Sequence, residues 1–162
     1  MVTKRPLSIL LLGTQMAVGG AQRLLLDQAQ WFVTQGHRVQ TAFFYDRDGL
    51  YDRWQKENDF PVYDLQAFST GLSFIPKVTA LFSGLWRLWS IMRRERFDVV
   101  ITYTQDSNTL GIPLAWLAGI PIRIGTYLGA IRGMAPLWRK IHAFIVNTGC
   151  MNRIVAASAG SR

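Results

Sequence analysis

The stretch LSILLLGTQMAVGGAQRLLLDQAQWFVTQ, residues 7–35, constrains the fold more than any other part of the sequence. An apolar run of strand length, residues 7–12, leads into a loop that ends in Gly19 and Gly20. Apolar residues then recur at helical spacing. A strand, a glycine-containing turn and a helix N-terminus bring backbone N–H groups and the positive end of a helix dipole to one place. The sequence therefore predicts an anion site over this turn, with a phosphate or diphosphate as its most natural occupant.

Strand-like and helix-like segments alternate along the rest of the chain. Six short apolar runs are expected as strands: residues 7–12, 39–45, 62–65, 98–102, 122–126 and 154–157. Strands that alternate with helices pair in parallel through right-handed crossovers. We therefore expect a Rossmann-like, doubly wound α/β fold, a parallel sheet of about six strands with helices on both faces. At 162 residues the chain is expected to form a single domain, residues 1–162.

The longest expected helix covers residues 77–96 and carries apolar residues at helical spacing. Such a stripe is far more common on a helix that packs against a sheet than in a cofactor-binding box. The residues expected to face the sheet are Val78, Leu81, Phe82, Leu85, Trp89 and Met92.

The formal net charge is +8, and basic residues stand beside aromatic ones, as in LWRLW at residues 85–89 and LWRK at residues 137–140. A basic chain favours an anionic partner. Basic side chains beside amphipathic rings suit a membrane interface or single-stranded nucleic acid. Nucleic-acid binding is supported only by the charge and the aromatic residues, so we expect no nucleic acid as a partner.

The single cysteine, Cys150, cannot form an internal disulfide, so a reducing compartment is expected. No stretch is long and apolar enough to span a bilayer. Lys4, Arg5 and the apolar run after them resemble the start of a signal peptide, but that run is short and continues into an amphipathic helix. We expect a cytoplasmic location, with peripheral attachment at the inner face of the membrane as an open alternative.

In an open parallel sheet, ligands bind beyond the carboxyl ends of the strands, near the point where the strand order reverses. Three loops are expected to converge there: residues 13–20, 103–107 and 127–133. They offer glycines, hydroxyls, amides, the carboxylate of Asp106 and the guanidinium of Arg132. The second of them also contains residues suited to capping the helix that follows. Together these groups could hold a phosphate and a hydroxylated molecule.

Several common site types are missing from the sequence. The glycine turn is not GxGxxG and lacks the GK[ST] ending of a P-loop. His37 and His142 have no partner at the spacing of a metal site, and no Gly-x-Ser-x-Gly elbow is present. Asp46 and Asp48 are interpreted as turn formers rather than ribose ligands. We expect no metal site, and no catalytic residue is identified.

Three segments resemble the amino-terminal domain of glycosyltransferase family 4, which has the GT-B architecture. VGGAQRLLLDQAQWFVTQGHRV is similar to the family's opening glycine turn, first helix and entry to the second strand. FDVVITY and LAWLAGIPIRIGTY are similar to its fourth strand, next helix and fifth strand. RIVAASAGSR resembles its sixth-strand segment. The resemblance covers essentially the whole chain and implies one half of a GT-B fold.

The resemblance also implies roles for particular residues. Gly19, Gly20 and Gln22 would lie against the diphosphate of a nucleotide-sugar donor. Two positions where the family often has histidine hold tyrosine here, and these hydroxyls would bind an acceptor instead. The acceptor-binding candidates are Tyr103, Gln105, Asp106, Tyr127 and Arg132.

By resemblance, we expect the acceptor-side domain of an enzyme that moves a sugar from a nucleotide-sugar to a hydroxyl acceptor, which could be lipid-linked. No cofactor and no essential metal are expected. We expect the carboxyl-terminal donor-binding domain of that family to be absent, and therefore no activity from this chain alone, as a fragment or as one half of a split enzyme with a partner chain. The alternative is a non-catalytic module whose basic aromatic helices, near residues 86–96 and 138–142, dock on an anionic membrane surface.

Overall fold

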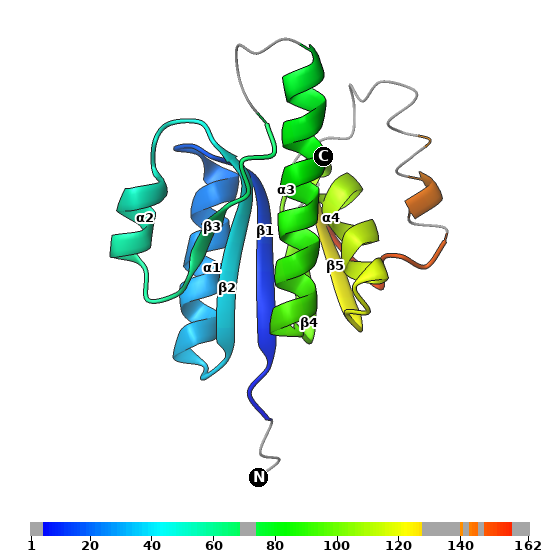
Figure 1. The fold of residues 1–162 in the computed structure, drawn as a ribbon. Helices are drawn as coiled ribbons and strands as arrows, with labels where there is room; N and C mark the ends of the chain where they lie inside the picture. Colours follow the sequence, from blue (N-terminus) through cyan, green and yellow to red (C-terminus); the bar gives the residue numbers. More distant parts are fainter. Residues whose placement is uncertain (1–4, 69–73, 128–139, 141–142, 146–147, 157–162) are drawn as a thin grey trace, which may run out of the picture.

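A six-stranded parallel sheet with the order β3-β2-β1-β4-β5-β6 forms the centre of the molecule (Figure 1). The computed structural model describes residues 5–68, 74–127, 140, 143–145 and 148–156. The strands are β1 (Ser8–Met16), β2 (Arg38–Asp46), β3 (Val62–Asp64), β4 (Val99–Thr102), β5 (Ile122–Tyr127) and β6 (Arg153–Ala156). The predicted number of strands and their parallel pairing are therefore confirmed.

Helices cover both faces of this sheet (Figure 1). They are α1 (Gly20–Thr34), α2 (Tyr51–Glu57), α3 (Phe74–Glu95) and α4 (Gln105–Leu117). Leu25 of α1 and Trp54 of α2 belong to one buried cluster, whereas Leu88 of α3 and Ile112 of α4 belong to the other. The two clusters lie on opposite faces, so the predicted Rossmann-like, doubly wound arrangement is confirmed.

The central strand β1 is buried on both faces, which explains its unbroken apolar run. Leu10 and Leu12 contribute to the cluster under α3 and α4. Ile9 and Leu11 contribute to the cluster under α1 and α2. All four side chains are at most 2% exposed. Since β1 also lies between β2 and β4 in the sheet, it contacts strands on both edges and buried clusters on both faces.

Strand β1 continues to Met16, four residues beyond the predicted end at residue 12. Its last residues remain paired with β2, where Gly13 lies opposite Phe43 and Met16 opposite Asp46. Pairing with the long neighbouring strand outweighs the local preference of Gly13 and the polar residues after it for a loop. The glycine turn is consequently much shorter than the expected loop of residues 13–20.

The outer face of α3 differs from the prediction. Phe82, expected to pack on the sheet, is 68% exposed, and Trp89 is only partly buried. The sheet instead receives the aliphatic stripe that includes Leu88, Ile91 and Met92. Gly84 lies directly against Ala67, where an added Cβ would clash with that residue. This close approach turns the glycine side of the helix inward and the aromatic side outward.

The basic aromatic helix expected near residues 138–142 falls largely outside the described residues. Along the part of the chain that is described, no helix combines the length and the apolar character that crossing a bilayer requires.

Candidate functional site

The strand order reverses between β1 and β4, which are neighbours in the sheet. The chain leaves β1 toward α1 on one face and leaves β4 toward α4 on the other. Thr14 Oγ1 and Thr104 Oγ1 meet here at 2.5 Å. Gly13, Thr14, Gln22, Tyr103 and Thr104 line a narrow crevice at this point. It is the position at which open α/β sheets bind their ligands.

Two exposed glycines begin α1 beside this crevice. Gly19 is the N-cap, with an extended backbone, and it has no side chain to accept the amide hydrogens of the first turn. No acidic residue lies in that turn, so nothing within it offsets the positive end of the helix dipole. A Cβ added to Gly20 would meet no heavy atom within 4 Å. The turn therefore presents the positive end of α1, and open space beside Gly20, to an incoming anion.

Gln22 holds the glycine turn in place. Its Nε2 donates a hydrogen bond to the backbone oxygen of Gln15 at 3.2 Å, which ties the first turn of α1 to the end of β1. Its Oε1 lies 2.7 Å from the position that a Cβ on Gly19 would occupy. Gln22 thus lies beneath the turn, next to Gly19, and fixes its shape.

A groove of about 770 Å³ opens from the glycine turn along the surface between α1 and α2. Leu26 and Trp54 form part of an apolar wall, and Arg23 and Arg53 add two guanidinium groups. Each arginine has an acidic partner one helical turn away, Asp27 at 3.8 Å and Glu57 at 2.7 Å. In the sequence these pairs are typical of a solvated helix surface, so the groove was not predicted. Only the packing of α1 beside α2 reveals it.

Tyr103 does not occupy the position expected of an acceptor-binding residue. It is 2% exposed, and its hydroxyl donates a hydrogen bond to Gln28 Oε1 on α1. Burial raises the pKa of Tyr103 well above its usual value. Ile101 and Tyr103 belong to the same cluster, because the alternation of β4 continues one residue past the strand. In this structure the hydroxyl is therefore not available to an acceptor. The alternation of side chains along β4, which puts Tyr103 on the same face as Ile101, was the sequence signal for this burial.

The other acceptor candidates have different surroundings. Gln105 and Asp106 are exposed in the first turn of α4. Tyr127 ends β5 and is half-buried, and desolvation raises its pKa despite a hydrogen bond with Asn108. Arg132 lies outside the described residues. The carboxyl ends of β4 and β5 are neighbours, which brings Gln105, Asp106 and Tyr127 to the same edge of the sheet as the backbone of Tyr103.

A buried polar network supports this edge. Thr102 Oγ1 donates to Asn108 Oδ1, and Asn108 Nδ2 donates to the backbone oxygen of Thr126 at 3.3 Å. Thr104 caps α4, with its N–H donating to Ser107 Oγ at 3.0 Å. This confirms the predicted capping role of the loop. The network fixes the relative positions of β4, α4 and β5, and it requires contacts that sequence reasoning did not identify.

Asp46 forms the turn predicted for it. Its carboxylate accepts hydrogen bonds from the backbone N–H groups of Leu50 at 3.0 Å and Tyr51 at 2.9 Å, at the start of α2. Among the residues that the structure describes, no three His, Cys, Asp or Glu side chains come close enough together to hold a metal ion.

The strand order, the crossovers and the glycine turn at the reversal point define a Rossmann-like α/β domain. Residues 19–162 match the model of a protein family described as "Glycosyl transferase 4-like domain". The chain belongs to this family, and its fold is that of an N-terminal GT-B glycosyltransferase domain. The resemblance inferred from the sequence is therefore confirmed.

Solved structures of glycosyltransferases share this fold at low sequence identity. MurG of Acinetobacter baumannii matches with a TM-score of 0.71 and 16% identity over 97% of this chain. A glycosyltransferase from Rickettsia africae matches with a TM-score of 0.67 and 18% identity over 96%. HepE of Anabaena, in complex with UDP and glucose, matches with a TM-score of 0.64 and 17% identity over 88%.

This chain spans less than half of each of those proteins, covering 43% of the MurG chain, 38% of the Rickettsia chain and 36% of the HepE chain. A comparison with curated protein sequences gave no match.

Proposed function

We propose that this chain is the acceptor-side domain of a glycosyltransferase that transfers a sugar from a nucleotide-sugar donor to a hydroxyl acceptor. One observation carries the proposal: the uncapped glycine turn at the strand-order reversal of a domain that belongs to a glycosyl transferase family. That turn offers amides and a helix dipole where the fold places its ligands.

The donor diphosphate would lie over Gly19 and Gly20. At Gly20, open space within 4 Å lets phosphate oxygens reach the backbone closely, which a side chain would hinder. Gln22 would act by holding the turn, through its hydrogen bond to Gln15, rather than by contacting the phosphate. HepE, which shares the fold, was solved with UDP and glucose, and this favours a nucleotide-sugar as the donor.

The acceptor would approach the edge formed by the carboxyl ends of β4 and β5. Gln105 and Asp106 are exposed there, and Tyr127 lies on the neighbouring strand. An exposed carboxylate and amide can orient an acceptor hydroxyl by hydrogen bonding. We propose that no cofactor and no metal take part, and that backbone amides and the positive end of the α1 dipole stabilise the diphosphate.

The other wall of the donor site would come from a second domain or a partner chain. The glycosyltransferases that share the fold are more than twice as long as the part that this chain matches. The chain alone is then expected to bind nucleotide weakly and to transfer no sugar.

Amide NMR of the chain during a titration with UDP and UDP-glucose tests the proposal. We expect the largest shifts at the amides of Gly19, Gly20 and Ala21, with saturation at millimolar rather than micromolar concentration. Glucose without nucleotide serves as the control. Shifts confined to the basic surface near Arg93, or no shift at saturating nucleotide, would contradict the assignment of the donor site.

A further inference from the structure

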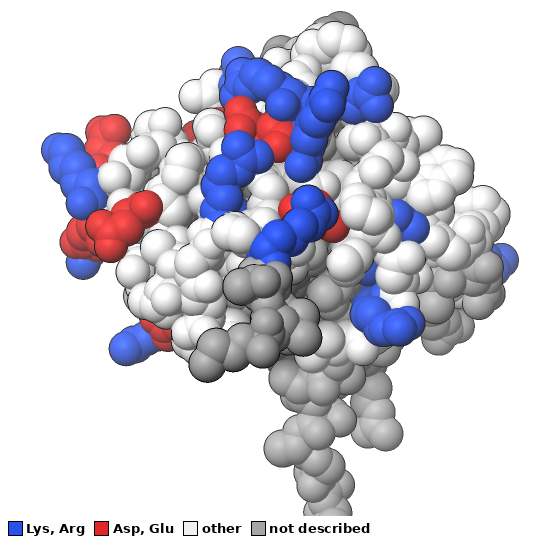
Figure 2. All heavy atoms as spheres, turned by 90° about the horizontal axis from the view of Figure 1, so that it is seen from below, with Lys and Arg blue, Asp and Glu red and all other residues white. Residues whose placement is uncertain are grey.

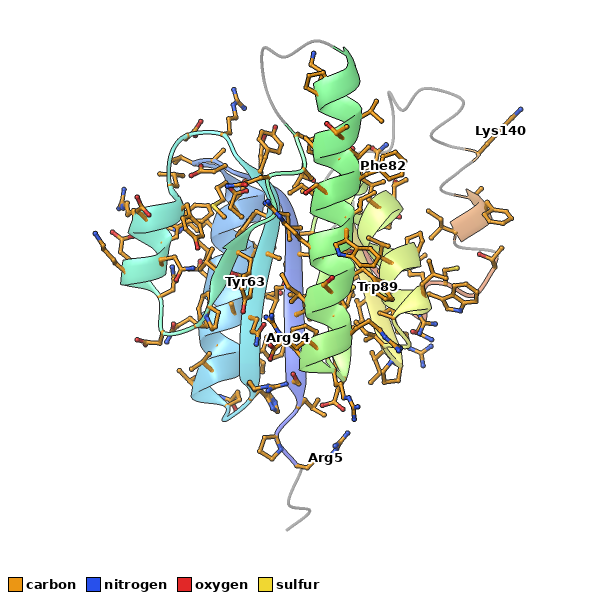
Figure 3. All side chains as sticks on the ribbon, in the orientation of Figure 1. Arg5, Tyr63, Phe82, Trp89, Arg94 and Lys140 are labelled. Atoms are coloured by element: carbon orange, nitrogen blue, oxygen red, sulfur yellow. The ribbon has the colours of Figure 1, made fainter. Side chains whose placement is uncertain are left out.

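The outward side of α3 carries an aromatic–basic strip that consists of Phe82, Trp86, Trp89 and Arg93. These residues are spaced by four, three and four positions, which places them on one side of a helix. Phe82 and Trp86 are 68% and 67% exposed. The rings of Trp86 and Trp89 lie 5.1 Å apart, and the Arg93 guanidinium carbon lies 5.9 Å from the Trp89 ring. Figure 3 shows Phe82 and Trp89 projecting from the same side of α3.

A cavity of about 390 Å³ lies at the foot of this strip, where α3 and α4 end. Arg93 and Arg96 line it, together with Met92, Phe97 and the segment 118–120. Because Arg93 belongs to both the strip and the cavity, the two form one continuous surface. This surface combines aromatic rings along the helix with two cations at its end.

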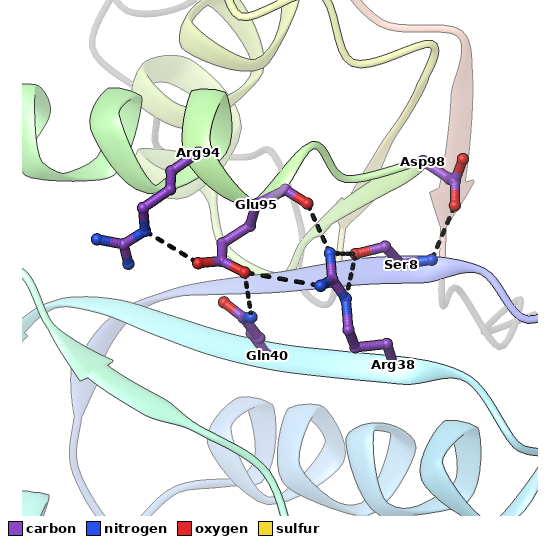
Figure 4. Close-up of polar contacts among 6 residues, drawn as sticks. All are labelled: Ser8, Arg38, Gln40, Arg94, Glu95 and Asp98. Carbon is purple, nitrogen blue, oxygen red and sulfur yellow. Dashed lines mark hydrogen bonds and ion pairs between the residues drawn. The ribbon is translucent and has the colours of Figure 1, made fainter.

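The two cations differ from the arginines around them. Arg94 pairs with Glu95 at 3.0 Å, and Arg38 lies 3.8 Å from the same carboxylate (Figure 4). Arg5 pairs with Asp98 at 2.6 Å. In the described parts of the chain, Arg93 and Arg96 form no ion pair with an acidic side chain. Figure 2 shows that Lys and Arg gather on the end of the molecule where the strands begin.

We propose that the aromatic–basic strip and its cavity bind the surface of a bilayer that contains anionic phospholipid. Arg93 and Arg96 would hold headgroup phosphates, and Phe82, Trp86 and Trp89 would enter the interfacial layer, where amphipathic rings are favoured. Exposed aromatic rings that cluster on a soluble surface mark an interaction site. The transferase function is not a premise of this proposal.

Charge and shape favour a bilayer over other occupants. A second copy of the chain would bring another net charge of +8 against this one, which opposes close association. Single-stranded nucleic acid is usually bound in a groove that follows its backbone. Here the rings stand on the outer side of a helix, which suits a flat partner. An anionic bilayer supplies both a negative surface and an apolar layer beneath it.

The orientation of α3 connects this surface with the candidate site. The helix runs opposite to the strands, so Phe82 lies toward the edge where the strands end and Arg93 toward the edge where they begin (Figure 1). A bilayer along the strip would therefore extend toward the edge that carries the glycine turn. A lipid-linked acceptor could reach that edge without leaving the membrane.

Vesicle sedimentation tests the proposal, with phosphatidylcholine vesicles and with vesicles that contain about one third phosphatidylglycerol. We expect binding to the anionic vesicles only, weakened by high salt. Trp86→Ala/Trp89→Ala and Arg93→Gln/Arg96→Gln should each weaken binding by about tenfold or more. No binding to anionic vesicles at low salt would overturn the proposal.

Matched controls separate this surface from net charge and from exposed tryptophan in general. Trp31→Ala removes a 56% exposed tryptophan from α1, on the other face of the sheet. Arg47→Gln/Arg153→Gln removes two charges elsewhere. Both controls should bind anionic vesicles as the parent chain does. Losses equal to those of the strip variants would overturn the proposal, as would strip variants that lose oligonucleotide binding but keep vesicle binding.

A label gives a second measurement that leaves the tryptophans and arginines of the strip unchanged. An environment-sensitive dye on Phe82→Cys, in a Cys150→Ala background, should shift to apolar emission when anionic vesicles are added. The same dye on Trp31→Cys should not shift. Equal shifts at both positions, or a shift caused by higher protein concentration without vesicles, would point to unspecific adsorption or self-association and overturn the proposal.

Discussion

Thr14 Oγ1 and Thr104 Oγ1 lie 2.5 Å apart, although the two residues are 90 positions apart in the sequence. Thr14 belongs to β1, and Thr104 caps α4 directly after β4. Their hydroxyl groups therefore join the two strands between which the strand order reverses. The crevice beside the glycine turn owes its narrow shape to this contact, because it fixes the start of α4 against the end of β1.

Replacement of Thr104 should weaken the junction. Thr104→Val keeps the shape of the side chain but removes the hydroxyl that bonds to both Thr14 and Ser107. We expect a loss of about 1–2 kcal/mol in the free energy of unfolding, measured by urea denaturation. Thr104→Ser keeps the hydroxyl and should stay within about 0.5 kcal/mol of the parent chain. Additive losses in Thr14→Val/Thr104→Val would contradict a direct contact between the two hydroxyls.

Gly20→Ala separates ligand binding from folding. An added Cβ meets nothing within 4 Å, and alanine favours a helix more than glycine does, by up to about 1 kcal/mol. The melting temperature should therefore be unchanged or higher, while binding of UDP falls by about tenfold as phosphate approach is hindered. Calorimetric melting and NMR titration measure the two effects. Ser83→Ala, an exposed helix substitution distant from the turn, should leave UDP binding unchanged.

Asn108→Ala should destabilise the chain more than any exposed substitution in α4. It removes the hydrogen bonds that Asn108 forms with the Thr102 hydroxyl and with the backbone oxygen of Thr126, while the Thr102 hydroxyl keeps the backbone oxygen of Ile124 as an acceptor. Removing a partner from a buried polar group costs about 1–3 kcal/mol, so a loss of about 1–3 kcal/mol is expected in denaturant unfolding. Gln105→Ala, in the exposed first turn of the same helix, should change stability by less than about 0.5 kcal/mol. Equal effects of both variants would show that the network contributes little.

Tyr103 should make the chain sensitive to alkali. Burial raises its pKa in the folded state above the ordinary value of 10.0. The unfolded chain therefore loses this proton first as the pH rises, and stability that is complete below about pH 10 falls above it. One proton corresponds to about 1.4 kcal/mol per pH unit. Tyr103→Phe should remove this part of the slope between about pH 10 and about pH 12, measured by denaturant unfolding.

Tyr127 supplies the comparison for this experiment, because its pKa is also raised by burial, against the opposing effect of a hydrogen bond with Asn108. Tyr127→Phe should leave the Tyr103 contribution in place. Identical pH slopes for the parent chain and Tyr103→Phe would mean that the Tyr103 hydroxyl reaches water in the folded state.

Local sequence patterns were sufficient to predict the sheet and the glycine turn. Strand β1 is apolar on both faces because neighbours cover it on both faces, and this leaves a direct trace in the sequence. The N-cap position of Gly19 follows from a glycine placed just before a helical pattern. The predicted end of β1 was four residues too early, because β1 stays paired with β2 beyond Leu12. A partner strand that lies far away in the sequence leaves no local signal.

The sequence by itself determined the order of strands and helices, the family and the location of the glycine turn, since each depends on residues close together in the chain. Only the tertiary structure decided which side of α3 faces the sheet, because the choice depends on Gly84 lying against Ala67. It also decided that Tyr103 points under α1 to Gln28 and that Thr14 meets Thr104. These contacts join segments far apart in sequence, so they depend on how the helices and strands pack and leave no local signal.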